Sequence, residues 1–151
     1  MKFEIYSGDW LTQPCDLLVV GVIAEKKKEA DVLFVPRGDA KEFNDALGGL
    51  LAEAIRDENF HGQKGETLMM QTQRILPAKR ALFIGMGTRD ALSLEQIREV
   101  AGTAILHAQR VNAKIVQFVV DAEISFVAKE YARAVTEGAL LAAYRFVKYQ
   151  S

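Results

Sequence analysis

The chain has 151 residues, of which 50% are hydrophobic and 26% charged, and these values are typical of one folded domain rather than a disordered chain. Its 19 basic residues stand against 20 acidic ones, and the net charge of -1 excludes a strong overall attraction to nucleic acid or to anionic membranes. The single cysteine, Cys15, excludes an internal disulfide and a cysteine-based zinc site. With no secretion signal or long apolar run, we expect a cytoplasmic protein.

The first part of the chain predicts three strands. Residues 3–6 alternate between apolar and polar side chains, which favours a strand. Residues 17–22 are apolar without interruption, a pattern typical of a strand that is buried on both faces of a sheet. A second apolar run at 32–35 ends at Pro36, and we expect a short strand there. Between these runs we expect an exposed loop, in which the basic run at 26–28 is offset by flanking glutamates.

The hydrophobic pattern then changes to a helical period. Between residues 40 and 56 the apolar residues recur at helical spacing, so we expect a single helix with one buried face. Gly48 and Gly49 fall inside this segment, where each glycine costs about 1 kcal/mol relative to alanine. A close approach of the helix to the sheet would explain why glycine stands there.

The second part of the chain predicts three further strands and the start of a helix. Apolar runs indicate strands at 67–72, 81–86 and 115–120. Ser93 followed by Gln96 is a capping-box pattern, which predicts that a helix begins directly after the serine.

A last amphipathic helix, expected over 124–143, completes an alternation of strands and helices. This alternation, with uniformly apolar central strands, predicts an α/β fold of three layers, α/β/α, with helices on both faces of the sheet. We expect a mixed sheet, because some early segments leave room for strand-to-strand connections without a helix. No linker or internal repeat is found, so residues 1–151 are interpreted as one domain.

The sequence contains no recognisable catalytic motif. His61 and His107 are far apart, and neither belongs to a His-Glu-x-x-His motif. No Gly-x-Ser-x-Gly motif occurs, and no base can be placed beside Cys15. The carboxylates are scattered over the expected helices and loops, so their spacing indicates no metal site. We predict no catalytic residue and no metal ligand in this chain.

The turn after the strand at 81–86 is a candidate for binding a ligand. Gly85-Met-Gly87 follows a strand and leads toward a helix, but Asp90 stands where a dinucleotide fingerprint has its third glycine. Backbone N–H groups of such a turn can hold a phosphate. We therefore take Gly85, Gly87 and Thr88 as a candidate phosphate or ligand loop, with a plain tight turn as the alternative.

Five motifs, each weakly specific alone, follow one another along the chain. They are Asp16-Leu-Leu-Val-Val-Gly-Val22, Ala46-Leu-Gly-Gly-Leu-Leu51, Phe60-His-Gly-Gln-Lys-Gly-Glu-Thr67, Leu76-Pro-Ala-Lys-Arg-Ala-Leu-Phe-Ile-Gly-Met-Gly87 and Glu137-Gly-Ala-Leu-Leu-Ala-Ala-Tyr-Arg-Phe-Val-Lys-Tyr149. In this order and at these separations, they resemble the N-terminal domain of the leucine aminopeptidases, a family of metallopeptidases. The resemblance covers nearly the whole chain, with a departure at 25–39.

The resemblance implies a macro-domain-like fold and a role in assembly or regulation. In this family, a C-terminal domain binds two divalent metals, commonly zinc or manganese, and hydrolyses N-terminal residues from peptides. The Asn-Thr-Asp-Ala-Glu-Gly-Arg signature of that domain has no counterpart here, so we expect the catalytic domain to be absent. The implied partners are that peptidase domain and further copies in a hexamer. Tyr144, Phe146 and Tyr149, which follow the last expected helix, are candidate contacts with the missing domain.

A second interpretation stays open beside this one. A macro-like fold suggests a stand-alone module that binds ADP-ribose or a related nucleotide at the candidate loop. The family also has members that act on DNA, but the near-zero charge argues against nucleic-acid binding here, and no membrane association is expected.

Overall fold

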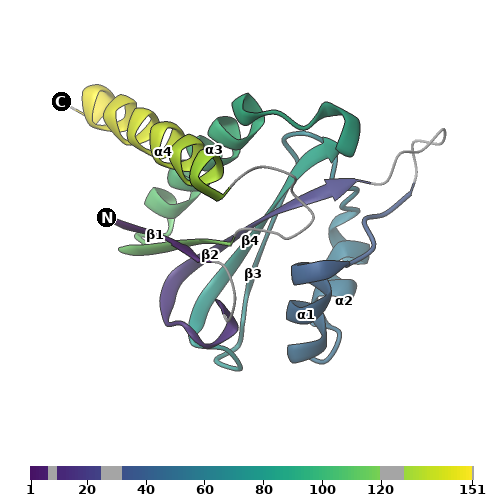
Figure 1. Ribbon diagram of the computed structural model, residues 1–151. Coiled ribbons are helices and arrows are strands. Elements are labelled where there is room, and N and C mark those ends of the chain that lie inside the picture. Colours follow the sequence, from purple (N-terminus) through teal and green to yellow (C-terminus); the bar gives the residue numbers. More distant parts are fainter. Residues whose placement is uncertain (7–9, 25–31, 120–127, 151) are drawn as a thin grey trace.

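The computed structural model describes residues 1–6, 10–24, 32–119 and 128–150 (Figure 1). Within these ranges, one sheet contains five strands in the order β1-β5-β2-β4-β3. The strands are β1 (Lys2–Tyr6), β2 (Cys15–Ala24), β3 (Thr67–Gln71), β4 (Ala78–Thr88) and β5 (Ile115–Val119). The helices are α1 (Gly38–Ala46), α2 (Leu50–Glu58), α3 (Leu94–Arg110) and α4 (Ala128–Gln150), with two 3-10 turns, η1 (Trp10–Thr12) and η2 (Arg89–Ala91).

Neighbouring strands run parallel except at one edge of the sheet. β2 pairs in parallel with β4 and β5, and β1 pairs in parallel with β5, whereas β3 runs antiparallel to β4. Among these neighbouring pairs, only β3 and β4 have a short connection, residues 72–77, and parallel pairing would need a crossover of a dozen residues or more. The prediction of a mixed sheet is therefore confirmed.

Helices cover both faces of the sheet and give three layers (Figure 1). Leu17 and Val19 of β2 face a core that α3 and α4 complete, whereas Leu18 and Val20 face a second core beneath α1 and α2. All four side chains are at most 2% exposed. This two-sided burial confirms the predicted α/β class, and it explains why β2 has no alternation of polar and apolar residues.

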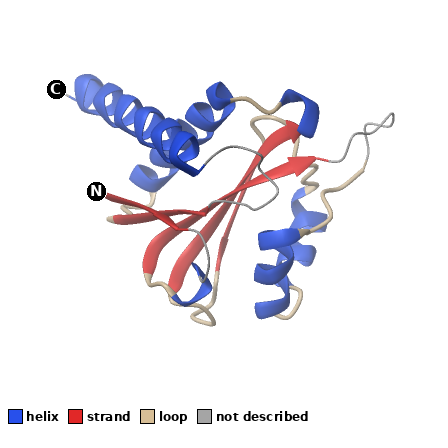
Figure 2. Cartoon of the chain, in the orientation of Figure 1, coloured by secondary structure: helices blue, strands red, loops and turns tan. Residues whose placement is uncertain are grey.

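The helix expected over residues 40–56 is two helices. α1 ends at Ala46 and α2 begins at Leu50, and the break between them is visible in Figure 2. Gly48 and Gly49 have φ angles of 64° and 94°, in the left-handed region that glycine adopts without strain. A Cβ at either glycine would meet no atom within 4 Å, so the expected close approach to the sheet is wrong. These glycines form a turn.

The strand expected at 32–35 is also wrong, because this segment is irregular. Its Phe34 N–H donates to the Phe60 carbonyl at 2.9 Å, and the two rings meet edge to face at 5.9 Å between centroids. Phe34 is buried, whereas Val35 is 53% exposed. The run is apolar because Phe34, together with the partly buried Leu33, packs a loop against the core beneath α1 and α2. The part of the departure at 25–31, with its basic run, lies outside the described residues.

The helix on the other face begins as predicted. Ser93 Oγ accepts a hydrogen bond from the Gln96 N–H at 3.2 Å, which confirms the N-cap of α3. The Gln96 side chain does not close the capping box, because its Nε2 donates to the Met86 carbonyl at 2.6 Å.

α4 is longer than the sequence pattern indicated. The predicted start at 124 lies outside the described residues, and the predicted end at 143 is wrong, because the helix continues to Gln150. No glycine or proline follows Gly138, so nothing in the sequence stops the helix. The strands predicted at 3–6, 17–22 and 81–86 are confirmed. Those at 67–72 and 115–120 are confirmed up to Gln71, where β3 ends, and up to Val119, because Val120 is not described.

Candidate functional site

The nucleophilic and titratable side chains singled out from the sequence form no catalytic group. Burial raises the pKa of Cys15 to about 12, so its thiol stays protonated and unreactive near neutral pH. Burial, and then the charge of Arg110, lower the pKa of His107. His61 Nδ1 lies 3.5 Å from Glu66 Oε2. Among the described residues, no three His, Cys, Asp or Glu side chains gather where they could hold a metal ion.

The candidate loop at Gly85, Gly87 and Thr88 lies at the carboxyl end of β4, where residues 62–66 cover it. The N–H of Gly85 donates to the Glu66 carbonyl at 2.8 Å, and the N–H of Gly87 donates to the Gly62 carbonyl at 3.2 Å. A Cβ at Gly85 would lie 2.1 Å from the Gln63 carbonyl oxygen. The two glycine amides are thus already used within the chain, and ligand binding at this loop stays a prediction.

A small pocket of about 250 Å³ lies beside this loop, between β4 and α3. Gln96, 4% exposed, lines it, and its Oε1 has no hydrogen-bond partner in the part of the chain that the structure describes. Lys64 Nζ lies 3.5 Å from Glu99 Oε2, and both residues line the same pocket. Because these two charges offset each other, the pocket presents little net charge.

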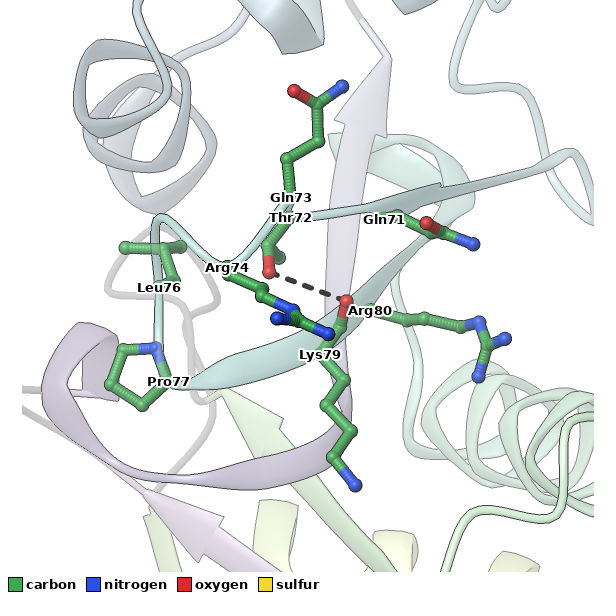
Figure 3. Close-up of a pocket in the computed structure, with 8 residues that line it drawn as sticks. All are labelled: Gln71, Thr72, Gln73, Arg74, Leu76, Pro77, Lys79 and Arg80. Atoms are coloured by element: carbon green, nitrogen blue, oxygen red, sulfur yellow. Dashed lines mark hydrogen bonds between the residues drawn. The ribbon is translucent and has the colours of Figure 1, made fainter.

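A larger and more basic pocket lies at the opposite end of β4 (Figure 3). Its volume is about 540 Å³, and all of its lining residues belong to the β3–β4 hairpin: Gln71, Thr72, Gln73, Arg74, Leu76, Pro77, Lys79 and Arg80. No carboxylate lines it. Sequence reasoning missed this hairpin pocket, although the stretch from residue 67 to 89 has no acidic residue and four basic ones.

A groove between α3 and α4 gathers exposed apolar side chains. Leu106 and Leu141, which are 45% and 52% exposed, line this groove. Leu140, which precedes Leu141 in the sequence, is 57% exposed. The helices cross closely, because a Cβ at Gly138 would lie 2.2 Å from the Arg98 carbonyl oxygen. The side chains of Tyr144, Phe146 and Tyr149, the predicted domain contacts, lie outside those that the structure describes.

The layers, the sheet order and the helices define an α/β fold that is shared with macrodomains. The macrodomain of Mycobacterium tuberculosis DarG superposes with a TM-score of 0.63 at 13% identity, over 92% of this chain and 90% of that one. A mutant of tomato leucine aminopeptidase superposes with a TM-score of 0.71 at 20% identity, over 94% of this chain but 28% of that one. These likenesses confirm the predicted macro-domain-like fold.

Sequence similarity narrows the class to one family. Residues 19–151 match the cytosol aminopeptidase family, N-terminal domain, and the chain belongs to this family. Probable cytosol aminopeptidases of Roseiflexus castenholzii and Alkaliphilus metalliredigens are 32% and 30% identical over the whole chain. The chain spans 27% and 29% of their lengths, less than a third in both cases. In the described residues, no helix has the length and apolar character needed to span a membrane.

Proposed function

We propose that this chain is the assembly or regulatory domain of a leucyl aminopeptidase and contains no part of the active site. On this proposal it packs against a C-terminal peptidase domain and joins a hexamer in the cytoplasm. The observation that carries the proposal is the match of residues 19–151 to the N-terminal domain of the family. Relatives named probable cytosol aminopeptidase, aligned with the whole chain, support it.

The metal chemistry of the family does not fit the residues described here. A pair of divalent zinc or manganese ions needs several convergent carboxylate, imidazole or similar ligands. The described part of the chain has no cluster of three such side chains, and the pKa of Cys15 favours its protonated form, which is a poor ligand. We therefore assign both metals, and the hydrolysis that they support, to the C-terminal domain.

The α3–α4 groove is the surface that we assign to domain contact. Half-exposed leucines together on two helices are unfavourable in water and stabilise an interface when covered. Arg98, whose Nε donates to Glu137 Oε2 at 2.9 Å, adds a polar rim. Tyr144, Phe146 and Tyr149 follow on α4 and remain the proposed extension of this contact.

A peptidase assay tests the non-catalytic part of the proposal. The purified 151-residue protein is incubated with leucine p-nitroanilide and added Mn²⁺ or Zn²⁺. We expect no release of p-nitroaniline above the blank. Turnover that follows the protein through purification would contradict the proposal, because it would place a complete site in this chain.

A chimera tests the assembly part. This chain replaces the N-terminal domain of the Roseiflexus castenholzii relative, and light scattering measures the mass of the product. We expect a hexamer with peptidase activity, and we expect Leu141→Glu to reduce assembly. Ile75→Glu is the matched control, because Ile75 is 53% exposed and Leu141 52%, and Ile75 lies away from the groove. A chimera that is folded but monomeric would contradict the assembly role.

The alternative is a stand-alone module that binds ADP-ribose or a related nucleotide near Gly85 and Gly87. The macrodomain likeness, which spans 90% of the DarG macrodomain, favours it at the level of fold alone. Against it, the amides of both glycines already donate to carbonyls of residues 62–66. Calorimetry with ADP-ribose on the native protein and on a Gly87→Arg variant separates the two proposals, because only the alternative predicts heat that a bulky side chain at this loop removes.

A further inference from the structure

We propose that the hairpin pocket, residues 71–80 between β3 and β4, is a binding site for a small polyphosphate anion. Such an anion can be free or can be the phosphate end of a nucleotide. The proposal does not depend on the aminopeptidase assignment. It rests on unpaired positive charge, on the turn that holds that charge, and on donors that approach from several sides.

The unpaired charge comes from two arginines. The third basic residue of the pocket, Lys79, forms an ion pair, because its Nζ lies 3.1 Å from Asp16 Oδ1. In the part of the chain that the structure describes, Arg74 and Arg80 take part in no ion pair. Because no carboxylate lines the pocket, its lining has a net charge of about +2 once Lys79 is paired. This charge favours an anion of two or more negative charges.

The backbone of the turn supports a binding role for Arg74. Ile75 N–H donates to the Thr72 carbonyl at 3.0 Å, and the two residues between them, Gln73 and Arg74, have φ angles of 55° and 64°. This is the pattern of a type I′ turn, in which Asn-Gly is strongly preferred and other residues are strained. The sequence thus has glutamine and arginine where asparagine and glycine would be more stable, and Arg74 gains its position over the pocket.

Hydrogen bonds hold the base of the turn. Thr72 is fully buried, its N–H donates to the Lys79 carbonyl at 3.1 Å, and its Oγ1 also lies 3.3 Å from that carbonyl (Figure 3). Pairing therefore continues one residue beyond β3 into the connection. Arg74 thus extends from a fixed base, which limits the entropy lost when its side chain binds a ligand.

The directions of the donors favour phosphate over carboxylate. In Figure 3 the Arg74 side chain extends toward Lys79, whereas Gln71 and Arg80 extend together on the other side of the strand. Guanidinium groups bind phosphate oxygens in bidentate pairs, and amide groups add further donors. A tetrahedral phosphate accepts hydrogen bonds from several directions, whereas the lone pairs of a carboxylate lie in one plane. A volume of about 540 Å³ leaves room for more than one phosphate group.

Calorimetry of the 151-residue protein with pyrophosphate, ADP and citrate tests the proposal. We expect pyrophosphate and ADP to bind and citrate to bind at least tenfold more weakly. Similar affinity for pyrophosphate and ADP indicates that the phosphates alone are recognised, and tighter ADP binding indicates a nucleotide. Binding of citrate without pyrophosphate, or of a short DNA duplex with neither phosphate ligand, would overturn the proposal.

Two double variants with the same net charge locate the site. Arg74→Gln with Arg80→Gln is expected to weaken pyrophosphate binding at least tenfold. The control, Arg56→Gln with Arg110→Gln, removes two exposed arginines elsewhere and is expected to retain binding within twofold. Thermal unfolding verifies that both variants fold. Equal losses in the two variants would show that general charge, and not the hairpin pocket, attracts the anion, and the proposal would then be wrong.

Discussion

β4 meets very different surroundings at its two ends. At the carboxyl end, residues 62–66 lie across Gly85 and use its N–H and carbonyl in hydrogen bonds. At the amino end, the strand enters a hairpin whose pocket of about 540 Å³ carries two arginines without ion-pair partners among the described residues. The first end was the candidate ligand loop in the sequence, whereas the second shows the stronger ligand chemistry in the structure.

This difference shows that a glycine-rich turn can bind an anion only through backbone N–H groups that have no hydrogen-bond partner within the chain. A helix or turn attracts phosphate through N–H groups that have no partner, and these are consumed when another segment of the chain lies over them. The charge of a long basic side chain is less easily neutralised within the chain, because an ion pair needs a carboxylate nearby. Asp16 pairs with Lys79, and the acid-free stretch from residue 67 to 89 supplies none for its neighbours.

The largest expected effect is at the covered end. We expect Gly85→Ala to lower the free energy of unfolding by about 3 kcal/mol, because the new methyl group would lie 2.1 Å from a backbone carbonyl that cannot move freely. Gly65→Ala is the control, since its Cβ would meet nothing within 4 Å and only the φ of 86° is unfavourable, at about 1 kcal/mol. Urea unfolding measures both. Equal losses of unfolding free energy in the two variants would show that residues 62–66 can move away from residue 85 at little cost.

The base of the hairpin should show the next largest effect. Thr72→Val removes a buried hydroxyl that donates to the Ala78 carbonyl, and we expect a loss of about 2 kcal/mol in unfolding free energy. Thr72→Ser keeps the donor and should lose less than half as much. If the two variants were equally stable in urea, the hydroxyl would not hold the turn.

Much of the fold could be predicted from the sequence, because buried positions of strands and helices appear as patterns of apolar residues. Continuous apolar runs located β2 and β4, since both faces of these strands are covered, and Ser93 marked the start of α3 through its side-chain oxygen. The hydrophobic pattern failed to show the turn between α1 and α2, because the apolar residues keep their helical spacing across it. Phe43, Leu47 and Leu51 keep helical spacing across the turn at Gly48, so the period alone could not separate α1 from α2.

The candidate site was less accessible because it depends on partners that are distant in sequence. Nothing near Gly85 indicates that the segment at 62–66 takes its amide, and nothing near Lys79 indicates that Asp16 pairs with it. The hairpin left one local signal, a run of basic residues without acids. The left-handed conformation of Arg74 left none, because turn rules favour asparagine or glycine at that position.

A redesigned turn separates stability from binding at the amino end. Gln73→Asn combined with Arg74→Gly supplies the residues that a type I′ turn prefers, and we expect the free energy of unfolding to rise by about 1 kcal/mol. The same variant should lose pyrophosphate binding at least tenfold. A rise in stability with unchanged binding would remove Arg74 from the site, and no rise would show that the native turn is unstrained.

The smallest effect on the free energy of unfolding should come from the ion pair between Asp16 and Lys79. Hydrogen bonds to Asp16 Oδ2, first from the Ile115 N–H and then from the Lys114 N–H, together with Lys79, hold the pKa of Asp16 below its usual value. A lowered pKa contributes stability above the unfolded value of about 3.9, and the contribution disappears as the pH falls through the lower folded value. The side chain is partly exposed, so we expect Asp16→Asn to lower the free energy of unfolding at pH 7 by less than about 1 kcal/mol.

The same substitution should act in the opposite direction on the pocket. Without the carboxylate, Lys79 is a third unpaired cation, and we expect pyrophosphate to bind severalfold more tightly at pH 7. Unfolding curves should show the stability difference between Asp16→Asn and the native protein shrinking below about pH 4, because the carboxylate is protonated there in the unfolded chain and, at still lower pH, in the folded protein. A stability difference that stays constant down to pH 2 would mean that the Asp16 charge has no part in it. Unchanged affinity would mean that Lys79 does not reach the ligand.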